Sequence, residues 1–184
     1  MKELSLNILD IAENSTKAKA ELVEIAIIED NEKLTIKISD NGMGMSDDTL
    51  GSVQNPFYTT RTTRKVGMGI PLFRLAAEQT GGNITITSKH IDLWPGDHGT
   101  TLTATFHKGH IDFTPLGDVV STITTLIQGH PNVDFLFSHV YGDSCVSLDT
   151  RELREVLEDV PLDSFEVLIW IKENLCEQYE EFNK

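Results

Sequence analysis

The chain of 184 residues is poor in cysteine, in long apolar runs and in positive charge. Its 2 cysteines, Cys145 and Cys176, are too few for a disulfide framework, which argues against a small disulfide-stabilised secreted domain. No apolar run reaches the length of a membrane span, and no signal peptide is recognisable. The formal charge of −14 argues against nucleic acid and anionic membranes as direct ligands. Together with the length, these absences predict a cytoplasmic protein of one large or two small domains.

The negative charge is concentrated in the second part of the chain. Residues 1–108 have a formal charge of −3, whereas residues 109–184 have a formal charge of −11. This change predicts a first domain at 1–108 and a small acidic α+β domain at 109–184. The elements expected in the second part are a helix over 116–128, a hairpin around Gly142-Asp143, and two helices with capping boxes at 149–152 and 163–166. No repeat occurs, and the second part contains no recognisable chemical motif.

A strand followed by a glycine-containing turn stands out in the first part. Alternating apolar residues predict a strand over 34–39, and Asp40-Asn41-Gly42-Met43-Gly44-Met45 follows it. Two glycines let the backbone approach a flat ligand closely, and the carboxylate can accept hydrogen bonds from that ligand. An ordinary tight turn explains the same pattern, so the interpretation depends on the motifs around it.

A polar stripe lies on the helix that precedes this strand. Helical spacing of apolar residues over 4–20 places Asp10 and Asn14 on one face, with Lys17 one turn further on. The acid and the amide oxygen suit magnesium, and the ammonium suits phosphate.

A basic and glycine-containing segment follows the turn. The stretch 59–72 is polar and basic, and Gly67-Met68-Gly69 leads into a helix expected at 71–79, which Gly81-Gly82 closes. Glycines before a helix N-terminus favour phosphate binding.

In this order the motifs resemble the ATP-binding domain of the GHKL, or Bergerat-fold, superfamily, which histidine kinases, DNA gyrase, heat-shock chaperones and mismatch-repair ATPases share. The similarity covers about residues 1–108 and is greatest to histidine kinase catalytic domains, whose lid start and last two strands are similar to 55–61, 81–88 and 99–106. The resemblance implies an α/β two-layer sandwich, a mixed sheet with helices on one face, here followed by the small α+β unit. It also implies ATP and Mg²⁺ as ligands.

The resemblance assigns roles to individual residues. Asn14 would hold Mg²⁺, Lys17 would contact phosphate, and Asp40 would accept the adenine amino group. The other expected contacts are Gly42 and Gly44 beside the base, Arg61 and Lys65 on the lid, Gly67, Met68 and Gly69 at the phosphates, and Thr100 near the adenine. Asp10 is the candidate catalytic base, because hydrolysing branches have a glutamate four residues before the asparagine. Since aspartate is one methylene shorter, a solvated helix acid is the alternative.

Three departures from the family pattern affect the expected function. Lys65 stands where a glycine usually begins the second glycine box, which should stiffen the lid hinge. We expect no dimerising phosphoacceptor helices, because the chain starts almost at the asparagine helix. An opening strand is also missing, which predicts an open sheet edge where a partner or a second copy could pair.

The sequence therefore predicts a Mg–ATP-binding, kinase-type subunit that transfers the γ-phosphoryl group to a separate protein, bound through the acidic second part or the open edge. The alternatives are an ATP-gated binding module with little turnover, and slow hydrolysis with Asp10 as base.

None of the 6 histidines has the helical His-Glu context of a phosphoacceptor. A zinc site of His130, His139, Cys145 and Cys176 lacks the usual short ligand spacing. The apolar residues of the last helix are expected to pack on their own domain.

Overall fold

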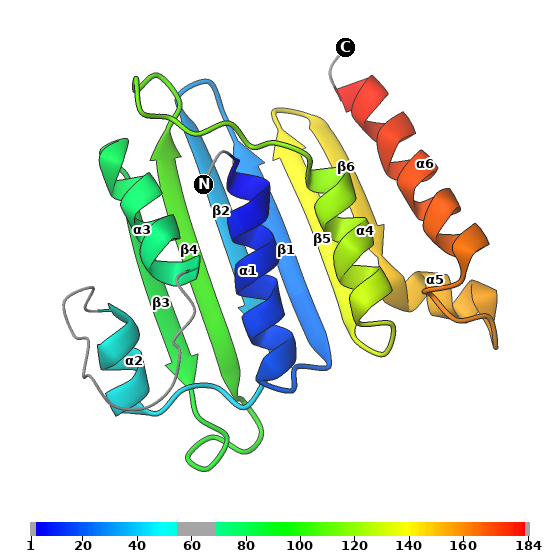
Figure 1. The fold of residues 1–184 in the computed structure, drawn as a ribbon, viewed down its shortest axis with the longest axis horizontal. Coiled ribbons are helices and arrows are strands. Elements are labelled where there is room, and N and C mark those ends of the chain that lie inside the picture. Colours follow the sequence, from blue (N-terminus) through cyan, green and yellow to red (C-terminus); the bar gives the residue numbers. More distant parts are fainter. Residues whose placement is uncertain (1–2, 55–68, 183–184) are drawn as a thin grey trace.

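The computed structural model describes residues 3–54 and 69–182, which form twelve elements. In chain order these are α1 (Leu4–Lys17), β1 (Leu22–Glu29), β2 (Lys33–Asp40), α2 (Asp47–Gln54), α3 (Gly69–Gln79), β3 (Asn83–Lys89), β4 (Gly99–His107), α4 (Val119–Gly129), β5 (Asp134–Tyr141), β6 (Ser144–Asp149), α5 (Thr150–Leu157) and α6 (Phe165–Phe182). Figure 1 shows α1, α3 and α4 side by side over one face of a single sheet. The helix α6 lies next to α4 and β6.

The six strands form one mixed sheet in the order β3-β4-β2-β1-β5-β6. All neighbouring pairs are antiparallel except β1 and β5, which run parallel. The predicted sandwich, with a mixed sheet and helices on one face, is confirmed. Alternation in the strands explains the two layers: Val23, Ile25 and Ile27 of β1 are buried beneath the helices, while Glu24 and Ile28 on the opposite face are exposed.

Local sequence signals predicted the ends of several helices and strands close to where the structure has them. The first helix ends at Lys17 rather than near residue 20, and Lys19 has a φ of +61°, outside the helical range. Helix α4 begins at Val119, because the preceding Asp118 side chain accepts a hydrogen bond from the Ser121 amide. The predicted hairpin is present, with Gly142 at a φ of +58° between β5 and β6.

The expected open edge at β1 is wrong, because β5 pairs with it over its whole length. The register runs from Leu22 beside Asp134 to Glu29 beside Tyr141. The strand that occupies this edge does not precede α1 but comes from more than a hundred residues further along the chain. The outer strands of the described sheet are β3 and β6. The boundary predicted near residue 108 lies between β4 and α4, and the division into two domains stays a prediction.

The outer edge of β6 is covered at one point by a side chain of α6. The Gln178 amide nitrogen donates to the Ser147 carbonyl (3.1 Å), and its oxygen accepts from the Ser147 amide (2.8 Å). The side chain therefore makes both hydrogen bonds that a neighbouring strand would make at this residue.

A buried polar cluster joins the first and second parts of the chain. His139 Nε2 lies 3.0 Å from Glu29 Oε1, and its Nδ1 lies 2.9 Å from the Tyr179 hydroxyl. Lys108 Nζ donates to the other Glu29 oxygen (2.8 Å). Burial lowers the pKa of His139 below its usual value, against the opposing effect of the Glu29 carboxylate. A neutral ring donating from Nε2 to Glu29 and accepting from Tyr179 satisfies all three groups.

Candidate functional site

The carboxylate of Asp40, at the end of β2, is fixed by three parts of the fold. The Ser15 hydroxyl of α1 donates to Oδ2 (2.6 Å). The Gly42 amide in the turn and the Thr100 amide of β4 both donate to Oδ1 (2.9 and 3.2 Å). These bonds orient the acid before any ligand arrives, and Oδ2 keeps capacity to accept another hydrogen bond.

The turn after Asp40 needs its glycines and is held at both sides. Gly44 has a φ of +67°, and a Cβ there would lie 2.0 Å from the Lys89 carbonyl oxygen. The Met43 amide donates to the Ala18 carbonyl (2.8 Å), and the Met45 amide donates to the Ser88 hydroxyl (2.8 Å). The turn is therefore clamped between the end of α1 and the end of β3.

A cavity of about 260 Å³ opens beside this turn. Apolar side chains dominate its lining, and the polar groups among them include Asp40, Asn14 and Thr100. The full lining is Ile11, Asn14, Ser15, Ala18, Ile38, Asp40, Gly44, Met45, Thr49, Val53, Ile70, Ile86, Thr100 and Leu102. Apolar walls with one fixed carboxylate suit a flat heteroaromatic ring that carries an amino donor.

The predicted residues of α1 differ in how they relate to this cavity. Asn14 is half-buried and lines it. Lys17 is exposed and lies 3.9 Å from Glu13. Asp10 is also exposed, and it touches the start of α3, where a Cβ at Gly69 would lie 3.0 Å from the Asp10 Cβ.

Four predicted ligand residues cannot be placed. The lid cations Arg61 and Lys65, and the phosphate contacts Gly67 and Met68, lie outside the described residues. Their roles stay predictions.

The structure adds three polar residues that sequence reasoning missed. Ser15 positions Asp40, the Ser88 hydroxyl lies 2.9 Å from the Thr100 hydroxyl, and His98 Nδ1 lies 2.7 Å from the Gly42 carbonyl oxygen. A signal for Ser15 was present, because it lies four residues after the buried Ile11 and therefore faces inward. Ser88 and His98 had no such signal, since their contacts depend on the pairing of distant strands.

Gly99 makes the close contact between β4 and the end of β2. Its φ is +136°, and a Cβ would lie 1.9 Å from the Asp40 carbonyl oxygen. Gly99→Ala is expected to destabilise the fold by about 3 kcal/mol, which lowers Tm by about 6–12 °C. Thermal unfolding followed by circular dichroism measures this. The control is Gly96→Ala in the loop just before β4, where a Cβ has no atom within 4 Å. Equal stability of the two variants would contradict the close contact.

Two kinds of feature are absent from the described ranges, 3–54 and 69–182. They contain no group of three or more His, Cys, Asp or Glu side chains that could hold a metal ion. None of their helices combines the length and apolar character needed to cross a membrane.

Comparison with protein families gives a match over the whole of the first part. Residues 1–110 match the family described as histidine kinase-, DNA gyrase B-, and HSP90-like ATPase. Two curated relatives are sensor protein KdpD of Clostridium acetobutylicum (28% identical over 94 residues) and C4-dicarboxylate transport sensor protein DctB of Pseudomonas aeruginosa (30% over 87 residues). The matches cover 48% and 46% of this chain, but only 10% and 14% of those proteins.

Solved structures resemble the fold over a longer stretch. The Aquifex aeolicus MutL ATPase domain complexed with ADP aligns with a TM-score of 0.54 at 15% identity, over 86% of this chain and 70% of that one. The N-terminal domain of a DNA repair protein aligns with a TM-score of 0.53 at 15% identity, over 80% and 53%. At this identity the likeness concerns the fold alone.

Proposed function

Because the chain belongs, through residues 1–110, to the family of histidine kinase-, DNA gyrase B-, and HSP90-like ATPases, we propose that it is a kinase-type subunit that transfers the γ-phosphoryl group of ATP to a separate protein. ATP binding is a property of GHKL domains, and the chain contains such a domain. The cavity beside Asp40 is the proposed adenine pocket. The carboxylate that Ser15, Gly42 and Thr100 hold in place is the observation that carries the proposal.

The adenine end fits the ligand chemically. Asp40 Oδ1 already accepts two amide hydrogen bonds, whereas Oδ2 accepts one from Ser15. An adenine amino group can therefore donate to Oδ2 without displacing a protein contact. The apolar lining, which includes Ile38 and Leu102, replaces water around the rest of the ring.

The phosphate end is proposed to lie where α1 and α3 meet. Asn14 offers an amide oxygen from the cavity wall, which suits a Mg²⁺ ion that takes its other ligands from phosphate oxygens and water. That ion supplies charge neutralisation when it is bound. Lys17 is exposed and can reach a phosphate, and the N-terminus of α3 at Gly69 presents backbone amides of the kind that bind anions.

The positions of the histidines in the fold agree with a phosphoacceptor on a separate protein. All 6 histidines fall within the described residues, and each lies outside the helices. His139 is buried and bonded to Glu29, and His130 Nε2 lies 2.8 Å from Glu13. A nucleophile supplied by a partner removes the need for a helical acceptor histidine in this chain.

The second candidate is an ATP-gated binding module with little or no turnover. Within the described part of the chain, no hydrogen-bond partner orients the exposed Asp10 carboxylate, and a general base needs a fixed position near its water. This observation disfavours hydrolysis through Asp10.

Incubation with γ-labelled Mg–ATP and an extract of the source cell separates these candidates. We expect label on a protein other than this chain, and loss of that label with Asp40→Asn. Asp10→Asn is expected to leave the labelling unchanged, because the carboxylate is not required for attack by a partner's nucleophile. Free phosphate that depends on Asp10 would instead establish hydrolysis. ATP binding with neither product would establish the gated module.

A further inference from the structure

Helices α5 and α6 enclose an apolar groove of about 450 Å³ at the β6 side of the molecule. It is lined by Leu153, Val156, Leu157, Glu166, Val167 and Trp170. Val156 is 81% exposed and Trp170 is 50% exposed, and Phe165 nearby is 73% exposed. Large apolar side chains gathered at a hollow on the surface mark an interaction site more often than scattered ones do.

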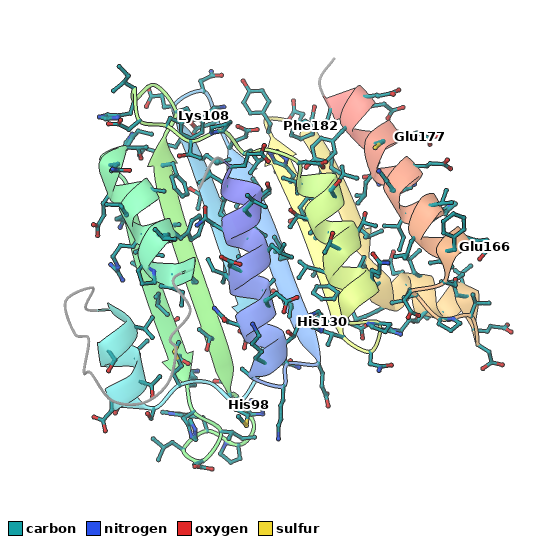
Figure 2. The ribbon with its side chains drawn as sticks, viewed as in Figure 1. His98, Lys108, His130, Glu166, Glu177 and Phe182 are labelled. Atoms are coloured by element: carbon teal, nitrogen blue, oxygen red, sulfur yellow. The ribbon has the colours of Figure 1, made fainter. Side chains whose placement is uncertain are left out.

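The segment that forms this groove is rich in exposed carboxylates. Glu166 lines the groove itself, and Glu152 lines the hollow that adjoins it. The others on α5, on the turn after it and at the start of α6 are Glu155, Glu158, Asp159 and Asp163. Figure 2 shows Glu166 at the α5 end of α6, whereas Glu177 lies nearer the other end. An acidic rim around an apolar centre selects a ligand with the opposite charge.

The basic residues of the same segment do not neutralise this rim. Arg151 is bonded through its guanidinium to Asp149 (2.7 Å), and Arg154 is bonded to Asp134 (2.7 Å). Lys172 follows Trp170 by two residues, which places it about 200° away around α6. The groove therefore keeps a negative rim.

A second hollow continues the groove toward the sheet. It shares Leu153 and Trp170 with the first, and its other lining residues include Glu152, Asp149 and Asn174. The combined surface is apolar between the helices and polar and acidic beside β6. A ligand that fits both hollows needs an apolar face followed by a cation.

We propose that the groove between α5 and α6 binds an amphipathic, basic helix of a separate protein. Its apolar side chains would fill the space between Val156 and Trp170, and its lysines or arginines would pair with the acidic rim. Binding by strand addition is disfavoured at this side, because Gln178 already makes both backbone hydrogen bonds of Ser147 at the β6 edge.

Charge argues against the other occupants. A second copy would bring two acidic rims together, and anionic lipid or nucleic acid would meet the same repulsion.

The proposal goes beyond phosphoryl transfer and does not depend on it, because the groove lies at β6 whereas the adenine pocket lies between α1 and β4.

Titration calorimetry with a synthetic probe helix tests the proposal. The probe is a leucine–lysine peptide of about 18 residues with helical periodicity. One control peptide replaces every lysine by glutamate, and a second replaces every leucine by serine. The probe is expected to bind at 1:1, and both control peptides are expected to bind at least about tenfold more weakly.

Four variants of the full chain locate the binding. Val156→Ser is expected to weaken binding about tenfold, and because this side chain is exposed the change leaves the fold intact. Glu152→Gln combined with Glu166→Gln is expected to weaken binding several-fold and to reduce its salt dependence. The controls, Leu93→Ser on a distant loop and Glu177→Gln on α6, are expected to bind the probe as the parent does.

Three results would overturn the proposal. The first is equal binding of the probe to the parent and to Val156→Ser. The second is equal binding of the leucine and serine peptides, which would reduce the effect to net charge. The third is a concentration-dependent dimer of the parent that Val156→Ser abolishes, which would make a second copy the occupant. Asp40→Asn is expected to keep probe binding, so a failed ATP site would not be mistaken for a failed groove.

Discussion

Replacing Asp40 with asparagine is expected to weaken ATP binding about a hundredfold. The adenine amino group then faces an amide N–H₂ group in place of the Oδ2 acceptor, and two donors cannot pair. Loss of a hydrogen bond to a charged acceptor, together with an unpaired donor in an apolar cavity, costs about 3 kcal/mol. That free energy corresponds to about a factor of one hundred in Kd.

The fold should tolerate this change. The asparagine oxygen can still accept from the Gly42 and Thr100 amides. The Ser15 hydroxyl, which donates to Asp40 Oδ2, can rotate and accept from the asparagine N–H₂ group instead. Thermal unfolding of Asp40→Asn is therefore expected to lie close to that of the parent, so that weak binding reports the contact itself.

Titration calorimetry with ATP and with purine riboside triphosphate isolates the contact, because the second nucleotide lacks only the amino group. The parent should prefer ATP, and Asp40→Asn should lose this preference. The matched control is Asp97→Asn on the nearby loop, whose carboxylate pairs with Lys89 outside the cavity. If Asp40→Asn still prefers ATP, a group other than Asp40 binds the adenine amino group.

Ending the chain after residue 110 is expected to unfold what remains. β5 pairs with every residue of β1, and α4 packs on α1. The start of α1 is also held by the second part, because the Leu4 and Ser5 amides donate to the carbonyls of Pro115 and Leu116. Removing these elements exposes the buried face of β1 and opens its edge to solvent.

Far-UV circular dichroism and a urea titration of the 1–110 fragment measure this loss. Two variants of the full chain report the same contact more finely. Phe137→Ala in β5 is expected to cost about 3–5 kcal/mol, since this ring is 1% exposed. Ser138→Ala on the opposite face is expected to change stability by less than about 0.5 kcal/mol. A fragment that folds and binds ATP would instead establish 1–108 and 109–184 as separate domains.

Local chemistry explains which parts of the fold could be predicted from the sequence. The periodicity of α1, the alternation of β2 and the turn at Asp40 depend on neighbouring residues. The hairpin at Gly142 and the cap at Asp149, whose side chain accepts from the Arg151 amide, are local in the same way. Asn14 and Asp40 could be singled out because they lie inside motifs that resemble those of GHKL domains; the structure brings both to one cavity, and their roles stay predictions.

The remaining features depend on contacts between distant residues. No pattern within β1 or β5 specifies that they pair, because a buried parallel strand and an edge strand can share one apolar sequence. The hydrogen bonds of Ser88 and His98 need the register between β3 and β4 and the path of the following loop. The groove between α5 and α6 could not be predicted for a different reason. Helical periodicity shows which residues of a helix are apolar, but it does not show which of those side chains remain exposed to solvent in the folded chain.

Because β1 pairs with a strand that lies far along the chain, β1 is made long before β5 during synthesis. Roughly 110 residues separate the end of β1 from the end of β5, and ribosomes add about 5–20 residues per second. The nascent chain therefore carries an unpaired β1 edge for roughly 6–20 s before its neighbour exists. During that interval the strand is open to other nascent chains, so yield in the cell should depend on translation speed and on chaperones that bind unfinished sheets.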